Sequence, residues 1–94
     1  MPVVGLLSIE LHIPGAHSLK EKRSVLRSLK DRLRKLNVAI AEVDHQDLWQ
    51  RARLGVVAVS ATRDGVERSL EAAVGEIDRK DSGLIVNTEI DWLS

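Results

Sequence analysis

One stretch of the chain, Ser18 to Leu36 (SLKEKRSVLRSLKDRLRKL), constrains the fold more than any other. Its leucines recur at helical spacing, so that one apolar stripe faces a core. The members of this stripe are Leu19, Leu26, Leu29, Leu33 and Leu36, with Val25 beside them. Ser18 and Glu21 fit a capping box, in which the serine oxygen accepts from the amide three residues on and the glutamate reaches back to the N-cap amide. We therefore predict one long helix over residues 18–36, ended by Asn37.

The same stretch is strongly basic. It holds eight Lys or Arg residues against two acidic ones, a net charge of +6, so the other 75 residues carry −6 in a chain that sums to zero. At about 100° per residue, five of the cations fall on one stripe of the helix. This basic stripe consists of Lys20, Arg23, Arg27, Lys30 and Arg34. It is an ordinary solvated face, a face paired with the acidic remainder, or a surface for a phosphate backbone or an acidic protein.

Lys22 is the exception among the cations, because its helical angle falls within the leucine stripe. We expect its stem to follow apolar surface near the start of the helix while its amine reaches water. The alternative is that Lys22 points into a site.

Composition excludes several classes of protein. The 94 residues suit one domain, residues 1–94, and the absence of cysteine removes disulfides, thiol chemistry and thiolate metal sites, which favours a cytoplasmic protein. No stretch approaches about 18 apolar residues, and residues 1–15 lack the basic start of a signal peptide, so we expect no membrane partner. Few Asn, Gln and Met residues beside many charges are typical of a heat-adapted, thermostable protein.

Four segments read as strands. We expect them at Val3–Ile13, Val38–Asp44, Leu54–Ala61 and Leu84–Trp92. In the first strand Leu7, Ile9, Leu11 and Ile13 share a core side, and Leu6, Ser8, Glu10 and His12 share the other. In the last strand Leu84, Val86, Ile90 and Trp92 take one side, and Ile85, Asn87, Glu89 and Asp91 the other.

A second helix separates the third and fourth strands. Thr62 or Asp64 caps it, and Asp64 and Glu67 have capping-box spacing. Its buried stripe is Val66, Leu70, Ala73, Val74 and Ile77. The connection from His45 to Arg53 is too long for a tight hairpin and has room for a helical turn at Asp47–Gln50.

The order of elements is βαββαβ. Two right-handed split β-α-β crossovers assemble it into a four-stranded antiparallel sheet of order 4-1-3-2 with both helices on one face. This is the α+β, ferredoxin-like sandwich.

The open face of this sheet is the first place to look for chemistry. Glu10 and His12 on the first strand are expected beside Glu89 and Asp91 on the fourth, and Glu42 and Asp44 can join them. Carboxylates near a histidine can bind a metal or act as acid and base. No recognised ligand spacing is present, however, so we favour a solvated or dimer-covered acidic face. His17 and His45 are expected to be exposed turn residues.

Trp49 in the long connection is the second place. A tryptophan beside a leucine in a loop commonly packs over the end of a core, which is the interpretation we favour. Otherwise it is an exposed partner-binding anchor, with Arg51 and Arg53 nearby. Trp92 is expected to close the core near the C-terminus.

The residues also resemble those of a known family. SLKEKR at 18–23, AEVD at 41–44, DLWQRA at 47–52 and LGVVAVS at 54–60 are similar to segments of the YlxP-like family, small bacterial proteins of unknown function, in an order that spans essentially the whole chain. The resemblance implies a ferredoxin-like fold. It also implies a place near translation, because genes of this family often lie beside translation and ribosome-maturation genes. It implies no catalytic residue.

No catalytic motif, phosphate-binding loop or cofactor fingerprint occurs, so we expect neither an enzyme nor a cofactor. Our first hypothesis is a binding module that presents the basic stripe to structured RNA or a ribosomal surface. The sheet is a poor RNA surface, because the chain has no Phe or Tyr on which bases could stack. The alternative is a protein-interaction or homodimerising module that uses the open sheet face or the Trp49 loop. Metal-assisted chemistry on the open face is a third, remote hypothesis.

Overall fold

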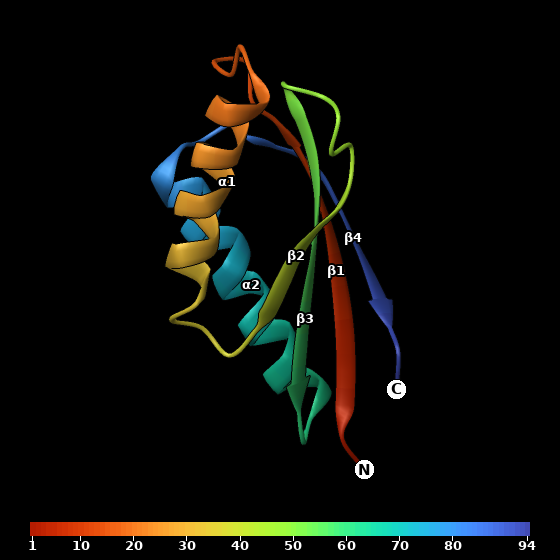
Figure 1. The fold of residues 1–94 in the computed structure, drawn as a ribbon. Coiled ribbons are helices and arrows are strands. Elements are labelled where there is room, and N and C mark those ends of the chain that lie inside the picture. The colour runs from red at the N-terminus through yellow and green to blue at the C-terminus, as the bar shows by residue number, and fades with distance from the viewer.

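The computed structural model describes residues 1–94 as one sheet and two helices (Figure 1). In chain order the elements are β1 (Val3–His12), α1 (Leu19–Leu33), β2 (Ala39–Asp44), β3 (Arg51–Ser60), α2 (Arg63–Lys80) and β4 (Ile85–Trp92). The four strands form one antiparallel sheet in the order β2-β3-β1-β4, with both helices on one face of it. The predicted ferredoxin-like α+β sandwich is thus confirmed.

The core lies between the sheet and the helices. It is one cluster of seventeen buried apolar residues, built from alternate residues of β1 and β3 and from the apolar stripes of α1 and α2. Leu7, Ile9, Leu11 and Ile13 are all buried, as the alternation of the first strand predicts. Neither helix is long and apolar enough to cross a membrane.

Helix α1 begins where the capping signal places it and ends earlier than predicted. The Ser18 hydroxyl accepts from the Glu21 amide at 3.1 Å. The Glu21 carboxylate accepts from the amide of His17, one residue before the N-cap, where the capping box places this bond at the N-cap itself. The helix ends at Leu33, three residues short of the predicted Leu36, because the chain then turns toward β2.

Helix α2 is capped by Thr62, whose hydroxyl accepts from the amide of Gly65 at 3.0 Å. The alternative cap, Asp64, lies inside the first turn. It pairs there with Arg68, so the spacing of Asp64 and Glu67 does not mark a capping box.

Strand β3 begins at Arg51, three residues before the predicted start, so the connection from β2 shrinks to residues 45–50. The predicted helical turn at Asp47–Gln50 is wrong. The connection instead makes a tight turn, in which the Leu48 amide donates to the His45 carbonyl. The earlier start of β3 places Arg51 opposite His12 and Arg53 opposite Glu10.

Strand β4 carries an irregularity that the sequence pattern does not predict. Asn87 pairs with Glu10 and Ile85 with Leu11, so Val86 is an extra residue in a bulge. Ile85 therefore packs against the core and Val86 is exposed, the reverse of the predicted assignment. Trp92 lies half-buried against the core near the C-terminus, as predicted.

Candidate functional site

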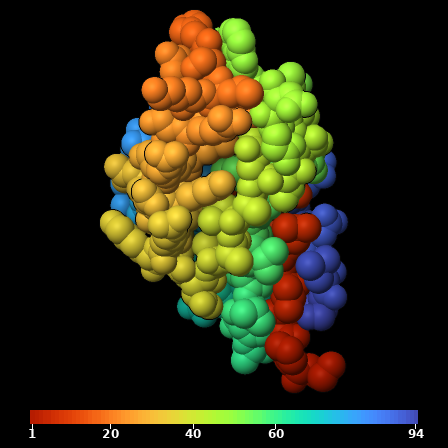
Figure 2. Space-filling model, in the orientation of Figure 1, coloured from red at the N-terminus to blue at the C-terminus, as the bar shows by residue number.

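The basic stripe of α1 lies on the surface, as the helical spacing predicts. Lys20, Arg23, Arg27 and Arg34 are exposed and Lys30 is half-buried. In the space-filling view the side chains of α1 stand beside those of β2 and the following connection (Figure 2).

Four of these five cations lack an acidic partner. The fifth, Arg34, pairs with Asp31 at 3.0 Å. Arg32, which is not part of the stripe, lies 3.9 Å from Glu76. Lys20, Arg23, Arg27 and Lys30 form no ion pair. The stripe is therefore not neutralised by the acidic remainder of the chain.

The stripe also borders a hollow of about 300 Å³ between α1 and β2. Arg23, Arg27, Lys30 and Arg34 line it, with Leu26 and Glu42. Glu42 is the one acidic group in this hollow, and its charge is already engaged by Lys22. An anion in the hollow would thus meet cations from three successive helical turns.

Lys22 behaves differently from our expectation that its amine reaches water. It is buried, with 1% of its surface exposed. Its Nζ lies 2.9 Å from Glu42 Oε2 and donates to the His45 carbonyl at 2.6 Å. The contact with Glu42 Oε2 is an ion pair without hydrogen-bond alignment, since this buried oxygen accepts no hydrogen bond. Lys22 thus joins α1 to the end of β2.

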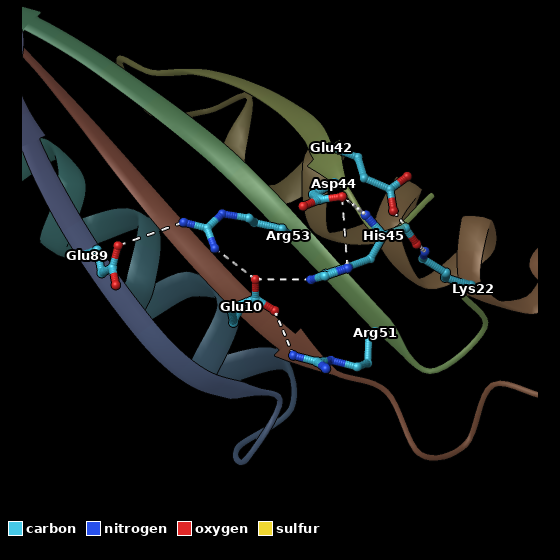
Figure 3. A network of polar contacts seen from close by, with 8 residues as sticks. All are labelled: Glu10, Lys22, Glu42, Asp44, His45, Arg51, Arg53 and Glu89. Atoms are coloured by element: carbon cyan, nitrogen blue, oxygen red, sulfur yellow. Dashed lines mark hydrogen bonds and ion pairs between the residues drawn. The ribbon is translucent and has the colours of Figure 1, made fainter. Parts of the chain in front are cut away.

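His45 extends this polar network across the sheet (Figure 3). It is half-buried, not the exposed turn residue that we predict, and its backbone is left-handed with φ 64°. This conformation is uncommon for a residue with a side chain. Its amide donates to Asp44 Oδ1 at 2.8 Å, and its Nε2 lies 3.2 Å from Glu10 Oε1.

Glu10 is the centre of the network. Arg53 donates to it at 3.0 Å and Arg51 at 3.4 Å, while Arg53 also lies 3.8 Å from Glu89. Burial raises the pKa of Glu10. The hydrogen bonds from Arg53 and His45, together with the positive charges of His45 and Arg51, outweigh burial and leave that pKa below its ordinary value.

Glu10 and Glu89 lie on the open face, as predicted, and both contact Arg53, but the acidic constellation predicted there is wrong in its charge and in the place of Glu42. Glu42 faces α1, not the open face, and Ser8, not Glu10, lies opposite Glu89. Arg51 and Arg53 enter this face because β3 begins early, and they neutralise Glu10. No three histidine or acidic side chains converge as metal ligands would.

The part of the open face toward β2 is apolar. A hollow of about 210 Å³ lies toward the β2 edge. Its lining is mostly apolar: Leu6, Ala39, Ile40, Ala41, Val43, Gly55 and Val57. The open face is thus divided into a charged half around Glu10 and an apolar half near β2.

Trp49 is exposed to 53% of its surface and does not pack over the end of the core. It and Leu48 line a wide hollow of about 510 Å³, together with His12 and Arg51. The partner-binding residues predicted around it divide between two places. Arg51 reaches both this hollow and the polar network, whereas Arg53 belongs to the network alone.

Fold and surface together define a small ferredoxin-like α+β protein with a basic helix and a partly apolar open sheet. The chain belongs to the family described as "Protein of unknown function (DUF503)", whose model matches residues 4–90. It is 42% identical over 77 residues to the uncharacterised protein YlxP of Bacillus subtilis (strain 168), a match covering 81% of this chain and 84% of that protein. The resemblance to the YlxP-like family is thereby confirmed.

Two solved structures are similar in fold. The de novo designed protein Foldit4 superimposes with a TM-score of 0.61 at 13% identity, over 100% of this chain and 98% of that one. A C-terminal segment of the alpha subunit of aIF2 from Pyrococcus abyssi gives a TM-score of 0.54 at 22% identity, over 98% of this chain and 49% of that one. At these identities the likeness concerns the fold alone.

Proposed function

We propose that this protein binds structured RNA, free or on a ribosomal surface, through the basic stripe of α1. The observation that carries the proposal is the lack of acidic partners for Lys20, Arg23, Arg27 and Lys30. Four unpaired cations on one helix face repel one another by about 0.2–0.5 kcal/mol per adjacent pair. A phosphate backbone removes that repulsion and releases condensed counterions.

The dimensions of the stripe support this proposal. From Lys20 to Arg34 it runs for about 21 Å at 1.5 Å per residue, long enough to follow several phosphates. The guanidinium groups of Arg23, Arg27 and Arg34 suit phosphate, because each can donate two parallel hydrogen bonds. An RNA helix is recognised mainly by shape and by its backbone, so the chain needs no base-stacking aromatic residues for this contact.

The test is the salt dependence of binding to a labelled RNA duplex, with co-sedimentation on isolated ribosomal subunits as a second readout. The doubly reversed variant Arg27→Glu/Lys30→Glu should bind at least about tenfold more weakly and show a flatter salt slope. Folding should survive, because neither side chain belongs to the buried core.

A matched control changes the same net charge on the other helix. Arg68→Glu/Lys80→Glu reverses two exposed cations of α2 and should leave affinity and salt slope nearly unchanged. If both double variants weaken binding equally, the effect is one of net charge and the α1 interface is wrong. Unchanged binding by Arg27→Glu/Lys30→Glu also overturns it.

The exposed Trp49 favours a second candidate function, recognition of a protein segment. Trp49 and Leu48 offer an apolar surface beside the Arg51 charge, and tryptophan and arginine are enriched where binding energy concentrates. This candidate needs Trp49 and not the basic stripe. If Trp49→Ala abolishes ribosome co-sedimentation while Arg27→Glu/Lys30→Glu leaves it intact, protein recognition replaces the RNA proposal.

A further inference from the structure

Strand β4 is less covered by the helices than the two central strands of the sheet are. β3 and β1 bury alternate residues against α1 and α2, but every residue of β4 from Val86 to Asp91 is exposed. Val86 and Ile90 expose 57% and 42% of their surfaces. β4 also pairs with β1 on one side only and so forms a free edge of the sheet.

A hollow of about 520 Å³ runs between α2 and this strand. Five of its nine lining residues are apolar: Leu7, Leu70, Val74, Ile90 and Trp92. The other four are Thr88, Arg63, Glu67 and Glu71. Thr88 and Ile90 face the helix side, because they pair directly with the buried Ile9 and Leu7 of β1. The exposed apolar surface is thus continuous with the free strand edge.

This edge has few of the features that usually keep strand edges from pairing: a bulge at Val86, and the charges of Glu89 and Asp91 on the open side. Residues 85–92 (IVNTEIDW) contain no Pro and no Lys, and no charge lies on the helix side from Thr88 to Trp92. The opposite edge, β2, is shorter, with six residues, and its Glu42 is tied to α1 by Lys22. β4 is therefore the edge available for strand addition.

We propose that a second copy of this chain pairs antiparallel with β4, about a two-fold axis perpendicular to the sheet at Thr88. The two sheets then form one eight-stranded sheet with all four helices on the same side. In this register Thr88 lies opposite its copy, Val86 opposite Ile90, and Asn87 opposite Glu89. Each Glu89 carboxylate then meets the side-chain amide of the copy's Asn87, on the open side of both sheets, because Glu89 and Asn87 pair with Ser8 and Glu10 of β1. Ile85 lies opposite Asp91.

Charge selects this register among its neighbours. Centring the axis on Glu89 places that carboxylate opposite its own copy, and centring it on Ile90 places Glu89 opposite Asp91, both of which are repulsive. Centring it on Asn87 avoids repulsion but leaves Val86 opposite Thr88. The Thr88 register alone pairs Glu89 with a side-chain amide. It does not involve the basic stripe, which adjoins the β2 edge, so this inference and the RNA proposal can fail separately.

The first test is molar mass by light scattering across a concentration series. The wild-type chain should approach twice 10.4 kDa. Thr88→Lys places two ammonium groups across the axis and should raise the dimer dissociation constant at least about tenfold. The matched control Ala41→Lys changes an exposed residue of the β2 edge and should leave the dimer intact. Circular dichroism checks that each variant is folded.

Cysteine cross-linking tests the register, since the native chain has no cysteine. Directly opposite residues of antiparallel strands have Cα atoms about 4.5–5.5 Å apart, within disulfide range. Thr88→Cys should cross-link to itself on mild oxidation. Val86→Cys should not, because its copies lie about 14 Å apart along the strands. Asn87→Cys should cross-link with Glu89→Cys in a mixture.

Three outcomes overturn the inference. The first is a wild-type chain that stays monomeric at every concentration. The second is a dimer that survives Thr88→Lys but is lost in Ala41→Lys. The third is a Thr88→Cys chain that stays unlinked while Val86→Cys links to itself.

Discussion

At Lys22 an ammonium group occupies a position where the helical spacing of the leucines favours an apolar side chain. Removing an ion from water costs several kcal/mol, which only close partners offset. Glu42 and the His45 carbonyl supply those partners from another part of the chain. Helical periodicity shows that a charged residue, Lys22, falls on the apolar stripe, but it does not show where the partner of Lys22 lies. The small residues of β2 leave it open which face Glu42 takes.

Lys22→Met should destabilise the fold by about 3 kcal/mol, because it keeps the buried stem but leaves Glu42 without its counter-charge. The double variant Lys22→Met/Glu42→Leu should recover most of that loss, since an apolar pair can replace a buried ion pair. Urea unfolding of the wild type and the two variants measures both effects. Equal stability of the single and double variants would mean that Glu42 is adequately solvated without Lys22.

Glu10 gives the fold a pH dependence of defined sign. Burial raises the pKa of Glu10. The hydrogen bonds from Arg53 and His45 and the nearby positive charges lower it by more, so that the pKa lies below the ordinary value of 4.5. The stabilisation from the Glu10 charge is therefore complete above about pH 4.5 and is lost as pH falls through the lowered, folded-state pKa.

Glu10→Gln should consequently reduce stability by about 1–3 kcal/mol at neutral pH, because it replaces a charged acceptor of arginine bonds. The difference from wild type should shrink as the pH is lowered below about 4.5. Urea midpoints at neutral and acid pH measure it. A difference that stays constant down to the acid limit would contradict the lowered pKa.

At the scale of elements, the sequence predicts every helix and strand, and it fails where pairing shifts their limits. Alternation in Leu7, Ile9 and Leu11 identifies the core side of β1, because a strand with one covered face has period two. Arg51 and Arg53 read as connection, since nothing local shows that they pair with β1. The bulge at Val86 likewise depends on the partner strand, and it inverts the local assignment of faces.

The basic stripe is the part of the candidate site whose position on the surface the sequence predicts well, because it lies within one helix and needs only the 3.6-residue period. The polar network needs contacts between residues distant in the chain. Glu10 and His45 are thirty-five positions apart, and no local pattern indicates that they meet.

Helix α1 has one cap whose contribution can be isolated. Ser18→Ala removes the acceptor of the Glu21 amide and should destabilise the protein by about 1 kcal/mol. Thr62→Ala, which removes the corresponding cap of α2, should cost about the same and serves as the comparison. Thermal or urea unfolding measures both. A loss of less than a few tenths of a kcal/mol for Ser18→Ala alone would show that α1 does not depend on this bond.

At the scale of the whole molecule, the chain is elongated, with extents of 44 × 22 × 18 Å and a Cα radius of gyration of 13.2 Å. The β4 dimer would place two centres about four strand spacings, roughly 19 Å, apart and raise the radius of gyration to about 16 Å. Small-angle scattering should show this increase for the wild type and the smaller value for Thr88→Lys. The same small radius for both chains would contradict the dimer.

The ion pair between Lys22 and Glu42 also has a consequence for how the sequence can change during evolution. Twenty positions apart, the two residues act as one unit: a neutral replacement at either leaves the other as a stranded charge. Substitution should therefore proceed in pairs, with an apolar residue at position 22 accompanied by an uncharged one at position 42. Exposed cations such as Arg27 have no ion-pair partner within the fold, so any constraint on their identity has to come from outside the chain.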